Sequence, residues 1–326
     1  MWMPDKNAGL SGDFAKNNKL DNVQLLAEGL VGPEDVTFDQ NGWLFTGLND
    51  GRIIKIDPNN PNSMVEVVNT KGRPLGMKFD IAGNLIVADA IKGIVSVSLT
   101  GEISVLVDSF ENEPFLFIDH LDIASNGDIY FSDASARFGV DNFILDFIET
   151  SFTGRVFKYS PSTGKTELVI NDLFFANGIA LGPNDEFLLV NETGKARVLK
   201  YQLKGEKKGK ISVFIDELPA MPDNVYFDEK NTFWFGLIAM RDWRIEKLAP
   251  FPTLRRIIGT LPSEILKPNH SYGFVIGVDL TGKVTHNYQT ETGFTNISGV
   301  VEHKGKLYLG ALEGNSIGVF SNPNLQ

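Results

Sequence analysis

Six stretches of the chain repeat one pattern, and this repeat limits the possible folds more than any other feature. Each stretch joins a polar or small residue, a short apolar segment, a turn and a second apolar segment, as in residues 32–47. Aligning the apolar segments puts six residues in register: Glu34, Leu75, Asp119, Asn177, Asp223 and Ser298. Successive members lie 41, 44, 58, 46 and 75 residues apart. A repeat of about 40 to 50 residues is typical of one β-propeller blade.

The turn signals between the apolar segments indicate how many strands each repeat holds. Clusters rich in Asn, Asp and Gly, such as Asn49-Asp50-Gly51, separate runs of four to six apolar residues. This spacing is typical of antiparallel hairpins, and each repeat supplies about four runs. We therefore predict an all-β fold, a six-bladed β-propeller that forms a single domain over residues 1–326. Residues 1–22 are a lead-in, and a strand over 23–27 pairs with the last blade to close the ring.

Two of the intervals are longer than a blade requires. In the insertion at about 136–152, Phe143 and Phe147 recur at helical spacing, as do Ile144 and Ile148. The insertion at about 241–270 also has helical stretches, including residues 261–266. Insertions in repeat proteins gather on one face, so we predict that both form a lid over one mouth of the central channel. The aromatic residues Phe138, Phe143, Phe147 and Trp243 either line a substrate pocket there or are packed core.

Composition restricts the partners and the compartment. The chain of 326 residues has a formal net charge of −11 and no cysteine. An acidic balance disfavours nucleic acid as a partner. Without cysteine there are no disulfides, thiolate zinc sites or cysteine nucleophiles, which favours a reducing cytosol. We find no signal-peptide pattern and no apolar run long enough to span a bilayer. These features predict a cytoplasmic protein with a small-molecule substrate and no membrane partner, and leave its oligomeric state open.

Four of the registered positions carry oxygen ligands. The innermost strands of a propeller meet around the channel, so Glu34, Asp119, Asn177 and Asp223 are expected to converge. Each alone is an ordinary turn residue, but three converging carboxylates repel one another unless a cation or a proton lies among them. An all-oxygen ligand set favours Ca²⁺, with Mg²⁺ or Mn²⁺ second.

Candidate catalytic groups lie at the same positions. Asp223, or else Asp119, would attack the substrate or activate water. His120 is either a proton shuttle or a packing residue, and either Asp119 or His120 faces the ion, because successive strand residues point to opposite faces. Ser298 has no evident base, which disfavours a serine nucleophile, and we place it among the substrate-binding residues.

Several segments together carry a family resemblance. They are residues 48–53 (LNDGRI), 72–76 (GRPLG), 153–159 (TGRVFKY), 176–181 (ANGIAL), 222–225 (PDNV) and 302–310 (EHKGKLYLG). The chain resembles the strictosidine synthase-like branch of the six-bladed propeller superfamily that includes the SMP-30/gluconolactonase, paraoxonase and diisopropyl fluorophosphatase families. The resemblance implies a channel calcium held by Glu34, Asn177 and Asp223. Many relatives have Asn followed by Asp in the third blade, where this chain has Asp119-His120.

The resemblance also implies an activity. Hydrolytic relatives open lactones, aryl esters or organophosphates, so we expect a calcium-dependent hydrolase of lactones or related esters, of the lactonase or arylesterase type. One alternative is a non-enzymatic propeller whose structural cation braces a binding platform. Another is amine–aldehyde condensation, as in plant strictosidine synthase. That enzyme relies on a glutamate at the position where this chain has Ser298, which disfavours condensation here.

Overall fold

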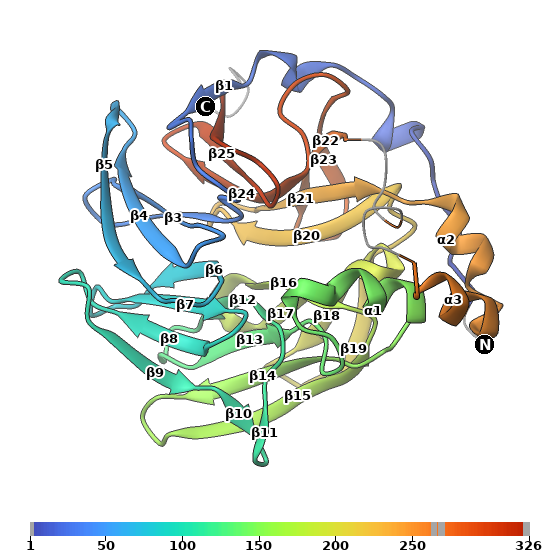
Figure 1. Cartoon of the computed structure of the whole chain (residues 1–326), viewed down its shortest axis with the longest axis horizontal. Helices are drawn as coiled ribbons and strands as arrows, with labels where there is room; N and C mark the ends of the chain where they lie inside the picture. The colour runs from blue at the N-terminus through green and yellow to red at the C-terminus, as the bar shows by residue number, and fades with distance from the viewer. Residues whose placement is uncertain (1–2, 262–265, 267–270, 322–326) are drawn as a thin grey trace.

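Six four-stranded antiparallel sheets form a ring in the computed structural model, which describes residues 3–261, 266 and 271–321. The blades follow one another along the chain and are arranged around a common central axis (Figure 1). The predicted six-bladed propeller is therefore confirmed. The first three blades are β2 (Val36–Phe38), β3 (Leu44–Gly47), β4 (Arg52–Asp57) and β5 (Asn60–Asn69); β6 (Pro74–Phe79), β7 (Leu85–Asp89), β8 (Gly93–Val97) and β9 (Ile103–Val107); and β12 (Ile118–Ile123), β13 (Ile129–Asp133), β14 (Gly154–Ser160) and β15 (Lys165–Leu173).

The last three blades complete the circle. They are β16 (Ala176–Leu181), β17 (Phe187–Glu192), β18 (Arg197–Gln202) and β19 (Ile211–Ile215); β20 (Ala220–Phe227), β21 (Thr232–Met240), β22 (Gly273–Asp279) and β23 (Val284–Thr290); and β24 (Ile297–His303), β25 (Lys306–Ala311), β26 (Ile317–Ser321) and β1 (Gln24–Leu26). A two-stranded hairpin, β10 (Ser109–Phe110) and β11 (Glu113–Pro114), projects between blades two and three.

The ring closes through β1. Its residues pair antiparallel with β26, Gln24 opposite Val319 and Leu26 opposite Ile317. This confirms the predicted closing strand, which covers an edge that would otherwise expose unpaired backbone groups. Apolar side chains fill the space between neighbouring sheets. Between blades one and two, for example, Phe45 packs with Val87 and Val95.

A β-bulge recurs in the innermost strand of five blades. The pairing with the second strand shifts between Pro74 and Met77, Ile118 and Leu121, Ala176 and Ile179, Pro222 and Val225, and Ile297 and Val300. Each bulge leaves two residues outside the ladder, and the first of them is the registered residue of that blade. Bulges redirect side chains. The repeat therefore explains how residues from separate blades come to face the channel.

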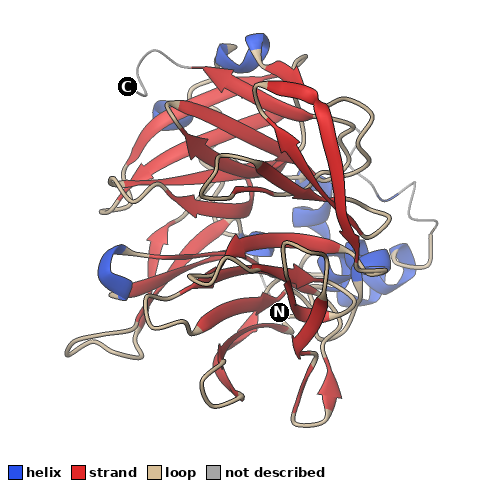
Figure 2. Cartoon of the chain, turned by 90° about the vertical axis from the view of Figure 1, so that its left-hand side faces the viewer, coloured by secondary structure: helices blue, strands red, loops and turns tan. Residues whose placement is uncertain are grey.

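The two insertions contain helices and pack against each other. The first has η3 (Val140–Asn142) and α1 (Phe143–Glu149), and the second has α2 (Trp243–Leu248) and α3 (Pro252–Ile258). The Arg255 guanidinium of α3 donates to the carbonyl oxygens of Ile148 and Glu149 at 3.2 and 2.6 Å. These carbonyl groups at the C-terminal end of α1 thereby gain hydrogen-bond donors. The helices of the two insertions lie together on one side of the ring (Figure 2). Residues 262–265 and 267–270 of the predicted lid, with most of the helical stretch at 261–266, lie outside the described residues.

Short 3-10 turns complete the chain: η1 (Gly12–Phe14), η2 (Lys19–Asn22), η4 (Pro183–Asp185) and η5 (Thr193–Lys195). The lead-in runs along the fifth blade, where the side chain of Gln289 donates to the carbonyl oxygen of Phe14 at 3.0 Å. Within the described ranges, no helix combines the length and the apolar character that crossing a bilayer requires.

Candidate metal centre and chamber

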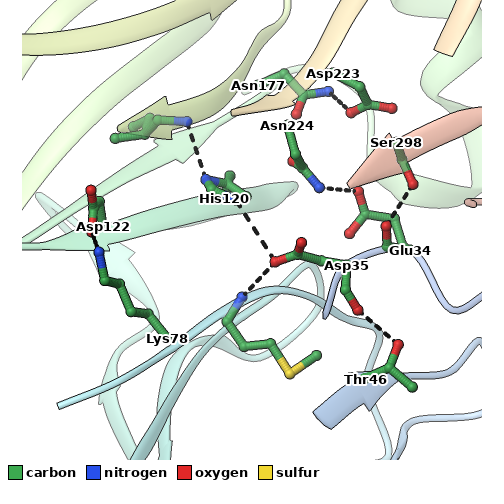
Figure 3. Close-up of polar contacts among 12 residues, drawn as sticks. Glu34, Asp35, Thr46, Lys78, His120, Asp122, Asn177, Asp223, Asn224 and Ser298 are labelled. Carbon is green, nitrogen blue, oxygen red and sulfur yellow. Dashed lines mark hydrogen bonds and ion pairs between the residues drawn. The ribbon is translucent and has the colours of Figure 1, made fainter. Parts of the chain in front are cut away.

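Three carboxylates meet at the centre of the ring, and we call Glu34, Asp119 and Asp223 the acidic cluster. One oxygen of each lies within 4.8 Å of the others, and their residues are only 2%, 3% and 4% exposed. Asn177 lies beside them and donates its Nδ2 hydrogen to Asp223 Oδ1 at 2.6 Å (Figure 3). The structure thus brings together the four residues that the sequence suggests as metal ligands, although they come from four different blades.

Two buried oxygens of the candidate ligands have no hydrogen-bond donor in the described part of the chain. Asn224 Nδ2 donates to Glu34 Oε1 at 2.6 Å (Figure 3), and Asn191 Nδ2 donates to the carbonyl oxygen of Asp223. Among the described residues, Glu34 Oε2 and Asn177 Oδ1 are buried and have no hydrogen-bond partner. Buried polar atoms normally have a partner. Orphaned oxygens beside three carboxylates therefore fit a hard divalent cation such as Ca²⁺.

Burial and mutual repulsion raise the pKa values of the cluster. The pKa of Glu34 lies well above its usual value, first because of desolvation and then because of the charge of Asp223. Desolvation and Asp223 act in the same way on the pKa of Asp119. Desolvation raises the pKa of Asp223 to about 7, against the hydrogen bond from Asn177. Without a cation, protons would relieve this repulsion, and a bound cation would displace them.

An apolar cavity of about 640 Å³, which we call the chamber, adjoins the acidic cluster. Its lining combines residues from the channel ends of the inner strands with residues of both insertions. Phe143 and Phe147 of α1 line it, together with Phe117 and Phe175. Phe175 packs against both α1 rings, with centroids 6.3 Å from Phe143 and 4.6 Å from Phe147. A chamber of this size and polarity suits a small molecule with an apolar body.

Two of the aromatic residues suggested for the pocket lie elsewhere. Trp243 is 64% exposed, with its ring 4.8 Å from Lys247 Nζ, and α2 presents Ile245 and Glu246 to the chamber instead. Phe138 packs against the guanidinium of Arg137 at 5.2 Å and is not part of the chamber lining. The orientation of each ring depends on how its short helix or turn docks, which helical spacing alone does not define.

His120 faces away from the acidic cluster. Its Nδ1 accepts a hydrogen bond from the Ile179 backbone at 3.1 Å, and its Nε2 lies 3.8 Å from Asp35 Oδ2 (Figure 3). It lines a separate, smaller cavity with Asp35 and Asp122, whereas Asp119 lines the chamber. Desolvation lowers the pKa of His120 to about 4, so the ring is neutral near pH 7. Of the Asp119–His120 pair, Asp119 is the residue that faces the candidate ion site.

Ser298 is fully buried at the start of β24. Its hydroxyl donates to the backbone carbonyl oxygen of Glu34 at 2.6 Å, and the residue does not line the chamber (Figure 3). This contact ties the last blade to the first at the cluster. The serine therefore holds the backbone of Glu34 in place, while its own hydroxyl is engaged.

Asp89 and Asp133, which the sequence analysis missed, belong with Glu192 to a second set of carboxylates that fixes the loops leading into the inner strands. Asp89, Asp133 and Glu192 end the second strands of three blades. They accept hydrogen bonds from the backbone N–H groups of Arg73 at 2.9 Å, Phe117 at 3.2 Å and Phe174 at 3.1 Å. The repeat alignment contains an acidic residue at the same position of three repeats, and this signal could have identified the set. Arg73, which lines the chamber, was also missed.

The fold and this centre define a class: six-bladed propellers with a buried all-oxygen site at the axis. A family model for strictosidine synthase matches residues 119–206, and one for the N-terminal part of strictosidine synthase-like proteins matches residues 12–56. Strictosidine synthase-like 4 of Arabidopsis thaliana is 34% identical over 304 residues, covering 90% of this chain and 80% of that protein. The chain belongs to the strictosidine synthase-like family, as its sequence motifs suggested.

Other comparisons extend the family and support the fold. The adipocyte plasma membrane-associated protein of Gallus gallus is 31% identical, covering 93% of this chain and 78% of its own. A gluconolactonase structure from Xanthomonas campestris superposes with a TM-score of 0.68 at 13% identity, covering 94% and 91% of the two chains. The calcium-binding protein regucalcin from Agrobacterium tumefaciens superposes with a TM-score of 0.64 at 14% identity, covering 90% of each. At these identities the structural matches show a shared fold.

Proposed function

We propose that this protein is a calcium-dependent hydrolase of lactones or related esters. The observation that carries the proposal is the position of the acidic cluster at the edge of an apolar chamber, where oxygens of Glu34 and Asn177 have no partner among the described residues. Two proteins of the same fold are described as a gluconolactonase and as a calcium-binding regucalcin, so the architecture is compatible with this chemistry.

Each residue of the centre has its own role in the proposed mechanism. Glu34, Asp119, Asn177 and Asp223 would hold the ion, with Mg²⁺ or Mn²⁺ as the alternatives to Ca²⁺. When bound, it supplies polarisation of the ester carbonyl and stabilises the negative charge that develops there. Asn177 and Asn224 orient the carboxylates through their Nδ2 hydrogens. Because Asn177 engages Asp223 Oδ1, the other oxygen of Asp223 is the one placed to attack or to take a proton from water. Asp119 is the second candidate for this role.

Two competing hypotheses are weaker on this geometry. Amine–aldehyde condensation needs an acid or base at position 298, where the hydroxyl of Ser298 is engaged by the Glu34 backbone. A proton-shuttle role for His120 requires access to the chamber, whereas its ring faces Asp35 in the smaller cavity. A non-enzymatic propeller with a structural cation remains the main competitor, because the cluster joins four blades.

The test is a panel of lactones and aryl esters assayed with added calcium and with chelator. We expect turnover that depends on calcium and is abolished in Asp223→Asn, with the fold intact by circular dichroism. Asp141→Asn, an exposed carboxylate at the chamber rim, is the matched control for the change of charge. Wild-type turnover in Asp223→Asn would contradict the proposed mechanism. Chelation that lowers the melting temperature, with no activity on any substrate, would support the structural cation instead.

We also propose a cytoplasmic location, which the lack of cysteine in the chain supports. Fractionation of the native source, with the protein traced by antibody, tests it. Recovery in the membrane or secreted fraction would contradict it.

A further inference from the structure

Arg73 is a charged residue of the chamber whose side chain the cluster chemistry does not use. It directly precedes β6, is 6% exposed, and lines the chamber together with Glu34 and Asp119. Its backbone N–H donates to Asp89 Oδ1 at 2.9 Å. Asp89 also accepts from the Thr70 hydroxyl at 2.7 Å. The loop is therefore fixed through its backbone, and the guanidinium is left for another partner.

The hydrogen-bond donors of that guanidinium are almost unused. Nη1 makes one long contact of 3.4 Å to the carbonyl oxygen of Pro74. Nη2 is buried and, within the described part of the chain, has no partner. Other arginines of the blades are satisfied: Arg155 pairs with Asp133, and Arg197 with Glu192 at 2.7 Å. A guanidinium has five N–H donors in a fork that matches a carboxylate. A buried fork whose Nη2 has no acceptor among the described residues leaves a place for a ligand oxygen.

With a cation bound, the cation and Arg73 together balance the charge of the acidic cluster. Three ionised carboxylates carry −3, a divalent cation supplies +2, and Arg73 supplies the remaining positive charge. Burial lowers the pKa of Arg73, while the charges of Glu34 and Asp119 oppose that effect. The acidic cluster, the cation and Arg73 together are thus neutral. A carboxylate on the ligand would meet two positive centres and an otherwise unsatisfied fork.

We infer that Arg73 binds a carboxylate of the ligand, and that the apolar body of this ligand packs against Phe117, Phe143, Phe147 and Phe175. The ligand class is an aryl or acyl compound that bears one carboxylate. The carboxylate has two possible sources: a substrate that already carries it, or the hydrolysis of an ester or lactone, which creates it. The second source rests on the proposed function, whereas binding of the carboxylate does not.

A binding experiment that needs no turnover tests the inference. The full-length, calcium-loaded protein is titrated calorimetrically with 4-phenylbutanoate and with its neutral amide. We expect the carboxylate to bind at least about tenfold more tightly than the amide, and Arg73→Met to remove that preference. Arg73→Lys keeps the charge without the fork, so part of the preference is expected to remain. Lys71→Met, an exposed lysine of the same loop, is the matched control and should bind like the wild type.

The outcomes are separable from those of the proposed function. Equal binding of acid and amide by the wild type would overturn the inference. So would a preference that survives in Arg73→Met at unchanged calcium stoichiometry, since the cation alone would then hold the carboxylate. If Arg73→Met does not fold, an undiminished preference in Arg73→Lys overturns it. Where the enzyme is active, KM is measured for a carboxylated lactone and for a neutral one. If Arg73→Lys raises KM for the carboxylated lactone relative to the neutral one, the substrate is the source of the carboxylate. If Arg73→Lys raises only the inhibition constant of the acid product, the product is the source of the carboxylate.

Discussion

Asp223→Asn is expected to stabilise the protein in the absence of a cation, although it removes a residue of the candidate site. Desolvation raises the pKa of Asp223 from 3.8 to about 7. The folded state therefore holds a proton that the unfolded state releases between these values. The free energy of unfolding then falls as the pH rises from about 4 to about 7 and is level above that. A rise of about three in pKa corresponds to about 4 kcal/mol at pH 8.

The asparagine avoids this penalty and keeps the local geometry. Its side-chain oxygen can still accept the Nδ2 hydrogen that Asn177 donates at 2.6 Å. It also removes the like charge that most strongly raises the pKa of Glu34 and of Asp119. For a chain of 326 residues, about 4 kcal/mol corresponds to a rise of about 6 °C in melting temperature.

The assay is differential scanning calorimetry in chelator at pH 8 and at pH 4.5. We expect Asp223→Asn to melt higher than the wild type at pH 8, with a much smaller difference at pH 4.5. Added calcium should raise the melting temperature of the wild type and leave the variant unchanged. Asp141→Asn serves as the control and should behave like the wild type throughout. A variant that melts at or below the wild type at pH 8 in chelator would refute the reasoning about repulsion in the cluster.

The remaining predictions concern proton competition, the chamber wall and the packing of the insertions. Calcium affinity should fall about tenfold or more between pH 8 and pH 6, because protons compete for carboxylates with raised pKa values; calorimetry at both pH values checks this. Phe147→Ala should raise KM for aryl lactones about tenfold, whereas Trp243→Ala should not, as steady-state kinetics will show. Arg255→Leu should lower the free energy of unfolding by about 1–3 kcal/mol and speed limited proteolysis within residues 241–261, unlike the exposed control Arg256→Leu. Unchanged affinity at pH 6, equal KM values or equal proteolysis would contradict these three expectations in turn.

The sequence predicts the convergence of the site because register in a repeat fold is a geometric constraint. Glu34 and Asn177 lie at equivalent places in their blades, so closing the ring brings them together despite their separation in the chain. The helices of the insertions follow from apolar spacing in the same way. These features depend on periodicity, which a single sequence displays.

Other features depend on tertiary packing that periodicity does not encode. The bulge in β12 decides that Asp119 faces the chamber while His120 turns toward Asp35. Alternation along a strand says only that the two side chains point to opposite faces. The rotation of α2 decides that Trp243 points outward. The proposed role of Arg73 rests on Nη2, which has no partner among the described residues, and only coordinates reveal this.

Calcium binding tests the central claim most directly. The metal-free protein, prepared with chelator and checked by elemental analysis, is titrated with calcium chloride in a calorimeter at pH 8, beside Asp223→Asn and Glu34→Gln. The account predicts one tight site in the wild type, with release of protons, and a loss of affinity of at least about a hundredfold in both variants. Absence of binding by the wild type, or binding that both variants retain, would contradict it.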